Sequence, residues 1–143
     1  MHSLVPRLVL SLAVLSLAGA CGDSPTSPAG VTALAQTDLT VGAGAVAANG
    51  NSITVNYTGW LYDPSRTDNK GLQFDTSAAR GPFTFTLGSG QVIAGWDQGV
   101  VAMRVGGVRR LVVPPFLGYG SVRNGPIPGN STLVFDIELV SIQ

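Results

Sequence analysis

Alternation of apolar and polar side chains with a period of two is the feature that most constrains the fold. The pattern occurs in residues 53–58, 83–87 and 133–139. A period of two places every second side chain on the same face of a strand, so each segment predicts a half-buried strand. Residues 108–113 add a β-branched run that ends at Pro114 and Pro115, which cannot donate ladder hydrogen bonds. The chain is therefore predicted to be mainly sheet.

One short segment instead has a helical period. Trp96, Gly99, Val100 and Met103 stand at i, i+3, i+4 and i+7, which is one face of a helix. Gly106-Gly107 follows as a helix stop and turn. Strands on both sides of a single short helix predict the α+β class, with an antiparallel sheet folded over that helix.

Trp96 comes directly after an apolar pair and two small residues, in the stretch GSGQVIAGW at 88–96. A tryptophan needs neighbours for its large surface and its ring N–H. It could be the floor of a pocket lined by Val92 and Ile93, or simply a core residue. The stretch alone favours the core.

The N-terminal 20 residues predict a secretory signal of the lipoprotein type. Arg7 precedes an apolar run at 8–18, which is too short for a membrane span. LAGAC at 17–21 resembles a lipobox, with its aliphatic residue one place early, at Leu17. The alternative is ordinary cleavage that leaves a free thiol. Since Cys21 is the only cysteine, no disulfide can form within the chain, and lipidation of Cys21 is the favoured interpretation.

Three segments are therefore expected: a signal peptide at 1–20, a flexible tether at 21–36 rich in Ser, Pro, Thr and Gly, and one domain at 37–143. Acidic and basic side chains balance at eight each, which gives no indication of a nucleic-acid partner.

The residue inventory excludes several chemistries. The only histidine is His2, in the signal, and the only cysteine is Cys21, so triads, thiol nucleophiles and His or Cys metal sites are not expected. Ile93 occupies the third glycine position of a dinucleotide turn, which rules out that motif. Asp136 and Glu138 share one strand face and could act as an acid–base pair, but a solvated sheet face explains them more simply. We expect neither a cofactor nor a metal.

An ordered set of motifs resembles the FKBP-type peptidyl-prolyl cis-trans isomerases. The motifs are YTGWL at 57–61, FDTS at 74–77, PFTF at 82–85, VIAGWD at 92–97, PP at 114–115, YG at 119–120 and TLVF at 132–135. Each is weak alone, but their order and spacing match the family over nearly all of residues 37–143. The resemblance implies an FKBP-like fold and raises Trp96 from core residue to pocket floor.

The resemblance also implies the residues of a proline pocket. Trp96 would lie beneath the proline ring, with the backbone N–H of Ile93 and the hydroxyl of Tyr119 binding ligand carbonyls. Asp75 would be the pocket carboxylate, oriented by Tyr57 and Arg80. The apolar walls would be Tyr57, Phe74, Phe83, Val92, Ile93, Ile127 and Phe135.

Two segments depart from the family pattern. The loop at 63–71 is longer than in the short forms. The segment at 123–129 has Pro126 where an aliphatic residue is usual and Gly129 where a second proline is frequent. At these positions the family pattern does not fix the place of Ile127, the substrate preference or the affinity for macrolides.

The sequence thus predicts an isomerase for Xaa-Pro bonds of exported proteins as they fold. It would be anchored through Cys21 in the cell envelope and face the periplasm, with the outer membrane favoured over the inner. Macrolides of the FK506 type are expected ligands. The rival hypothesis is a non-catalytic module that uses the same pocket to hold a proline-containing partner.

Overall fold

The computed structural model describes residues 31–143, so the predicted signal peptide, Cys21 and most of the predicted tether lie outside the described residues. The strands are β1 (Ala35–Thr40), β2 (Ser52–Tyr62), β3 (Lys70–Thr76), β4 (Phe83–Thr86), β5 (Val108–Val113) and β6 (Leu133–Ile142). The helix α1 spans Ala94–Gly99, and short 3-10 turns η1 and η2 occupy Ser77–Ala79 and Pro115–Leu117. The segment at 118–132, which joins η2 to β6, is called the flap below. The expected domain start at Thr37 falls inside β1.

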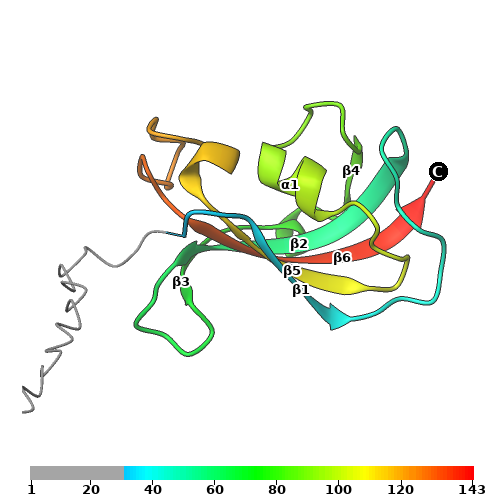
Figure 1. Ribbon diagram of the computed structural model, residues 1–143, viewed down its shortest axis with the longest axis horizontal. Coiled ribbons are helices and arrows are strands. Elements are labelled where there is room, and N and C mark those ends of the chain that lie inside the picture. Colours follow the sequence, from blue (N-terminus) through cyan, green and yellow to red (C-terminus); the bar gives the residue numbers. More distant parts are fainter. Residues whose placement is uncertain (1–30) are drawn as a thin grey trace, which may run out of the picture.

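All six strands form one antiparallel sheet in the order β1-β5-β6-β2-β3. β4 pairs with the first half of β2, beside the place where β3 pairs with its second half. The helix α1 lies across one face of the sheet (Figure 1). The predicted α+β class, a sheet folded over one short helix, is confirmed.

The core lies between α1 and the inner sheet face. Ile53 and Val55 of β2, Leu111 of β5, and Ile137 and Leu139 of β6 are fully buried. These side chains are alternate residues of their strands, as the period of two requires. The helix contributes Trp96, and Val100 and Met103 follow it in the turn.

The helix is shorter than its apolar pattern predicts. It ends at Gly99, and Met103 is buried on an irregular turn rather than on a helix face. Two glycines explain why so short a helix fits here. A Cβ on Gly95 would stand 2.5 Å from Val113 Cγ1, and one on Gly99 would stand 2.6 Å from Leu111 Cδ2. Glycine weakens a helix but permits this close approach to β5.

A buried arginine holds α1 to the edge strand. Nη1 of Arg109 donates to the carbonyls of Gly99 and Val101, 2.9 Å each, at the end of the helix. Nε and Nη2 of the same side chain donate to Asp38 of β1 at 2.6 and 3.3 Å. The hydrogen bond from Arg109 lowers the pKa of Asp38. Strand β1, helix α1 and strand β5 are thereby joined at one side chain.

Charged residues gather on the opposite, outer face. Asp136 accepts hydrogen bonds from Arg110 at 2.7 and 2.9 Å and from Lys70 at 2.8 Å. The Lys70 ammonium also stands 4.0 Å above the Trp60 ring. Asp136 is therefore part of an ion-pair cluster rather than a freely solvated carboxylate, whereas Glu138 is exposed. No helix within residues 31–143 is both long and apolar enough to cross a bilayer.

Candidate active site

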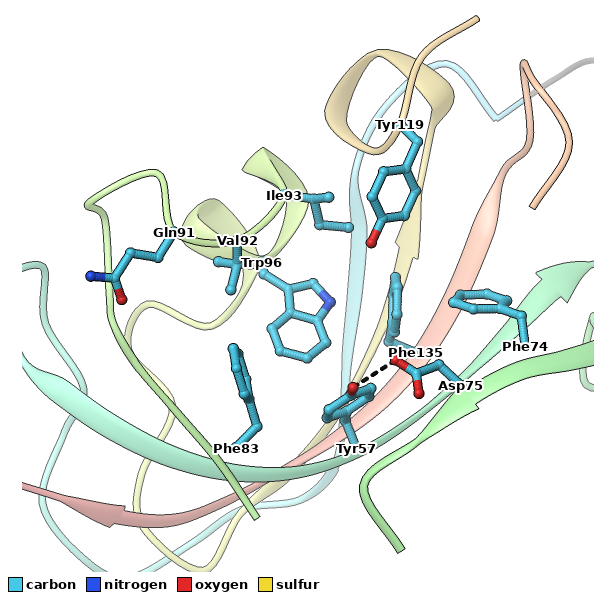
Figure 2. A pocket seen from close by; sticks show the side chains of 10 residues that line it. All are labelled: Tyr57, Phe74, Asp75, Phe83, Gln91, Val92, Ile93, Trp96, Tyr119 and Phe135. Carbon is cyan, nitrogen blue, oxygen red and sulfur yellow. Dashed lines mark hydrogen bonds between the residues drawn. The ribbon is translucent and has the colours of Figure 1, made fainter. Parts of the chain in front are cut away.

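A cavity of about 190 Å³ opens beside α1 on the inner face of the sheet (Figure 2). Its residues come from β2, β3, β4, β6, the loop before α1, α1 itself and the flap. The lining residues are Tyr57, Phe74, Asp75, Phe83, Gln91, Val92, Ile93, Trp96, Tyr119 and Phe135. Every predicted site residue except Ile127 thus meets at this one place, and Gln91 is an addition.

Trp96 forms the centre of an aromatic cluster at the base of the cavity. Its ring centroid lies 4.9 Å from that of Tyr57 and 5.3 Å from that of Phe135, both in T-shaped geometry. Phe83 and Phe85 complete the contacts at 6.4 and 5.8 Å. Only 5% of Trp96 is exposed. Side chains on all sides fix the indole, so the floor is rigid and apolar.

The indole N–H has no hydrogen-bond acceptor within the described residues, although it is buried. Figure 2 shows this edge of the ring turned toward Phe135. The two rings stand at 87° to one another, which suits an N–H···π contact. Such a contact partly compensates the buried donor.

A hydrogen-bonded group of three side chains forms the polar edge of the cavity. The Tyr57 hydroxyl donates to Asp75 at 2.7 Å, and Arg80 donates both to this hydroxyl and to Asp75. The backbone N–H of Thr76 donates to the same carboxylate at 2.9 Å. Burial and the neighbouring carboxylate raise the pKa of Tyr57 to about 12, so its hydroxyl stays protonated at neutral pH.

Two hydrogen-bond donors without a partner belong to residues on the opposite side of the cavity. Neither the backbone N–H of Ile93 nor the hydroxyl of Tyr119 has a hydrogen-bond partner within residues 31–143. Burial and the charge of Asp75 raise the pKa of Tyr119, so its hydroxyl is also neutral. The Tyr119 hydroxyl points into the cavity (Figure 2). Together the two groups can bind carbonyl oxygens of a ligand.

Asp97 positions the loop that carries Ile93. Its carboxylate accepts the backbone N–H of Gly88 at 2.8 Å and that of Gly90 at 3.0 Å. Both glycines have positive φ, 79° and 76°, so the loop depends on residues without a side chain. This role of Asp97 is not among those expected from the sequence. An acidic residue in the first helical turn, just after two glycines, is the signal that could have revealed it.

Ile127 lies outside the cavity. It belongs to the flap, is buried with 4% exposure, and exchanges two backbone hydrogen bonds of 2.9 Å with Asn124. Gly129 has a steric reason nearby, because a Cβ there would stand 2.3 Å from the backbone oxygen of Ser121. The flap therefore folds back on itself around Pro126 and at Gly129, the two positions where the sequence departs from the family pattern.

The arrangement suits binding and reorientation of a small apolar group rather than bond cleavage. Within residues 31–143, no three His, Cys, Asp or Glu side chains are grouped as a metal site would require. The cavity offers an aromatic floor, fixed polar groups at one edge and open donors at the other. These are the features that a binding site for a small apolar ring requires.

The chain belongs to the FKBP-type peptidyl-prolyl cis-trans isomerases, whose family profile matches residues 44–140. The FK506-binding protein 1 of Aspergillus oryzae is 44% identical over 108 residues, covering 73% of this chain and 93% of that relative. The FK506-binding protein of Neisseria meningitidis serogroup B is 46% identical over 107 residues, covering 73% of this chain and 92% of the relative.

Solved structures of FKBP proteins have a similar fold. AtFKBP13 superposes with a TM-score of 0.68 at 38% identity, covering 80% of this chain and 96% of that one. FkpA from Escherichia coli gives a TM-score of 0.66 at 38% identity, covering 78% of this chain and 49% of that one. The resemblance seen in the sequence is confirmed at the level of family, fold and activity: this chain is a peptidyl-prolyl cis-trans isomerase.

Proposed function

We propose that this isomerase is a lipid-anchored protein of the bacterial cell envelope that acts on Xaa-Pro bonds of exported proteins, with the cavity beside α1 as its active site. One observation carries the assignment of the site. The cavity is lined by an aromatic floor at Trp96 and by Ile93 and Tyr119, whose backbone N–H and hydroxyl respectively have no hydrogen-bond partner within residues 31–143.

The chemistry of prolyl isomerisation matches such a cavity. Rotation about the Xaa-Pro bond has a barrier of roughly 18–20 kcal/mol because it breaks amide resonance. The twisted amide has lost the charge separation of that resonance, so it is less polar than the planar forms. An apolar cavity therefore binds the twisted amide better than the planar one, and this differential binding lowers the barrier.

Each lining residue then has a role. The proline ring rests on Trp96, between apolar walls formed by Tyr57, Phe74, Phe83, Val92 and Phe135. The Ile93 N–H and the Tyr119 hydroxyl hold the flanking carbonyls, which keeps the peptide bent around the rotating bond. Asp75 fixes the Tyr57 ring through its hydroxyl. In this mechanism no proton is transferred, and no covalent bond is made or broken.

Isomerisation of a short Xaa-Pro peptide, followed without a coupled protease, tests the site. The purified protein should accelerate the exchange, and a macrolide of the FK506 type should suppress it by occupying the cavity. A folded sample no faster than buffer would contradict the proposal. Peptide binding without turnover would favour the non-catalytic module.

The anchor rests on the lipobox-like sequence before Cys21. Acyl chains on this cysteine would supply membrane attachment, and the Ser-, Pro- and Thr-containing residues after it would let the domain stand off the surface. Exported clients follow from this address, since uncatalysed prolyl isomerisation takes tens to hundreds of seconds and limits folding.

Substitution of Cys21 tests the anchor directly. Cys21→Ser should move the protein out of the membrane fraction, whereas Ser24→Ala, just beyond the proposed cleavage site, should leave it there. Mass spectrometry of the unmodified protein should find a diacylated Cys21 at its N-terminus. A soluble mature protein that begins before Cys21 would overturn the proposed anchor.

A further inference from the structure

A second hollow of about 340 Å³ adjoins the proposed proline cavity. Tyr57, Asp75 and Phe83 line both spaces and therefore form the wall between them. On the far side of this wall the hollow is lined by Arg80 and Pro82. A peptide whose proline occupies the cavity can continue across the wall into this hollow.

Arg80 is the cation that the hollow offers. Its side chain is 65% exposed. Only Nη2 is used within the described residues, where it donates to the Tyr57 hydroxyl and to Asp75. A guanidinium has five N–H donors in a planar fork. The Nε and Nη1 edge is therefore available to a ligand.

The acidic partner of Arg80 already accepts three hydrogen bonds. One oxygen of Asp75 accepts the Tyr57 hydroxyl, and the other accepts the Thr76 N–H and Arg80. Tyr57 is the remaining titratable group that lines the hollow, and its pKa of about 12 keeps it neutral. A group entering the hollow thus meets a guanidinium with open donors and a carboxylate whose oxygens are occupied.

We propose that this hollow is a subsite for a residue flanking the proline, and that Arg80 makes the enzyme favour substrates with a carboxylate there. The inference rests on the proposed proline cavity. Nη2 lies 3.0 Å from the Tyr57 hydroxyl in the cavity wall. Two extended residues span roughly 7 Å, so a side chain within two positions of the proline reaches the guanidinium.

The expected preference is modest because Arg80 is exposed. An ion pair in this setting changes kcat/KM by about two- to fivefold. Added salt should shrink the preference, since the pair is screened by counterions.

A matched peptide series tests the subsite on the full-length protein. Each peptide contains one Xaa-Pro bond and carries Glu or Gln at one position, from two residues before to two residues after the proline. At one position the Glu peptide should be turned over two- to fivefold faster than its Gln counterpart. The readout is the ratio of Glu-peptide to Gln-peptide turnover by one preparation. Partial unfolding of a variant lowers both rates equally, so it leaves this ratio unchanged.

Substitutions then assign the preference to Arg80. Arg80→Gln should bring the ratio to about one, Arg80→Lys should retain part of it, and Arg80→Glu should invert it. Arg66→Gln is the control, because Arg66 is 64% exposed and also pairs with an aspartate, Asp63, but lines neither space. It should keep the full ratio.

The outcomes separate the two proposals. Equal turnover of Glu and Gln peptides at every position, or a preference that survives Arg80→Gln, overturns the subsite while leaving the proline cavity intact. Failure to turn over any peptide of the series overturns both.

Discussion

Asp75 and Asp136 form ion pairs on opposite faces of the same sheet, and their surroundings differ. Asp75, at the cavity edge, accepts from a hydroxyl, a backbone N–H and one guanidinium. Asp136, on the outer face, accepts only from the cations of Arg110 and Lys70. The first network holds an aromatic wall of the cavity, and the second ties β3, β5 and β6 together.

The difference shows where ligand binding can reside. On the outer face the charged side chains of the cluster satisfy one another. Around the cavity, the Ile93 N–H and the Tyr119 hydroxyl lack partners within the described residues. Most polar groups in folded proteins are paired, so open donors beside an apolar floor mark the functional face. Substitutions of residues that line the cavity or position its donors should therefore change activity, and those on the outer face should change stability.

Replacement of the floor should have the largest effect. Trp96→Leu keeps an apolar side chain but removes the surface under the proline ring, so kcat/KM should fall at least about tenfold, or ~1.4 kcal/mol. The cavity it opens should lower the free energy of unfolding by about 2–4 kcal/mol. Peptide kinetics well below the melting temperature separate the two effects.

Phe85→Leu is the matched control for this prediction. Phe85 contacts Trp96 and is 2% exposed, but it does not line the cavity. It should lose comparable stability and keep most of its activity. Equal losses of kcat/KM in the two variants would assign the effect to the core in general.

Loosening of the loop before α1 should have the next largest effect. Asp97→Asn keeps the size of the side chain but can accept only one of the two N–H groups of Gly88 and Gly90. A hydrogen bond to a charged group contributes about 1.5–3 kcal/mol. We expect a loss of about five- to tenfold in kcat/KM as the Ile93 N–H loses its fixed position.

The exposed neighbour Gln98 supplies the control, and Gln98→Ala should match the parent. Amide exchange at Gly88 and Gly90 gives a second measurement, since these protons should exchange faster in Asp97→Asn. Unchanged exchange together with unchanged kinetics would mean that the loop is held by other contacts.

The sequence predicts the regular part of the fold well because burial imposes a period. Strands β2, β5 and β6 bury alternate residues, whereas β4 buries Phe85 alone and leaves Phe83 exposed at the cavity. The sequence pattern nevertheless predicts all four strands. The sequence does not reveal strand β1, because all its residues are exposed and it is held by pairing with β5. Strand β3 also lacks an alternating pattern, because Leu72 and Gln73 in its middle are both exposed.

The candidate site likewise contains residues that the sequence predicts and residues whose roles it does not reveal. Trp96, Asp75 and Tyr119 were expected from motif order, and the structure brings them to one cavity. The positioning role of Asp97 depends on a loop conformation with two positive φ angles, which composition does not reveal. Motif position predicts Ile127 in the wall, but the place of this residue depends on how the flap folds over the core.

On the outer face, Asp136→Asn should lower stability while leaving activity unchanged. The side chain is 20% exposed, and its loss leaves Arg110 and Lys70 as unbalanced neighbours. The free energy of unfolding at neutral pH should fall by about 1–3 kcal/mol. Urea unfolding and peptide kinetics measure the two quantities, and a fall in kcat/KM to match Trp96→Leu would contradict the division between the faces.

The same variant has a defined pH dependence. Burial opposes ionisation of Asp136, but hydrogen bonds from Arg110 and Lys70 outweigh it and lower the pKa of this carboxyl. A lowered pKa stabilises the fold above the unfolded value of 3.8, and this contribution is lost as the pH falls toward the folded pKa. The stability gap between parent and variant should therefore be full at pH 6 and shrink progressively below about pH 5.

The smallest effect is expected from a single hydroxyl. Tyr119→Phe removes a donor that has no protein partner within residues 31–143, so the free energy of unfolding should stay within about 0.5 kcal/mol of the parent. If this hydroxyl binds a ligand carbonyl, its loss should weaken binding by about 0.5–1.5 kcal/mol, roughly two- to tenfold in Kd. Tyr62→Phe is the control, since Tyr62 lies on β2 away from the cavity lining. Calorimetry with a proline peptide should therefore separate the two tyrosine variants while their melting curves coincide. Equal affinities for both would mean that the Tyr119 hydroxyl is not used, and the carbonyl-binding role would then fall to the Ile93 N–H alone.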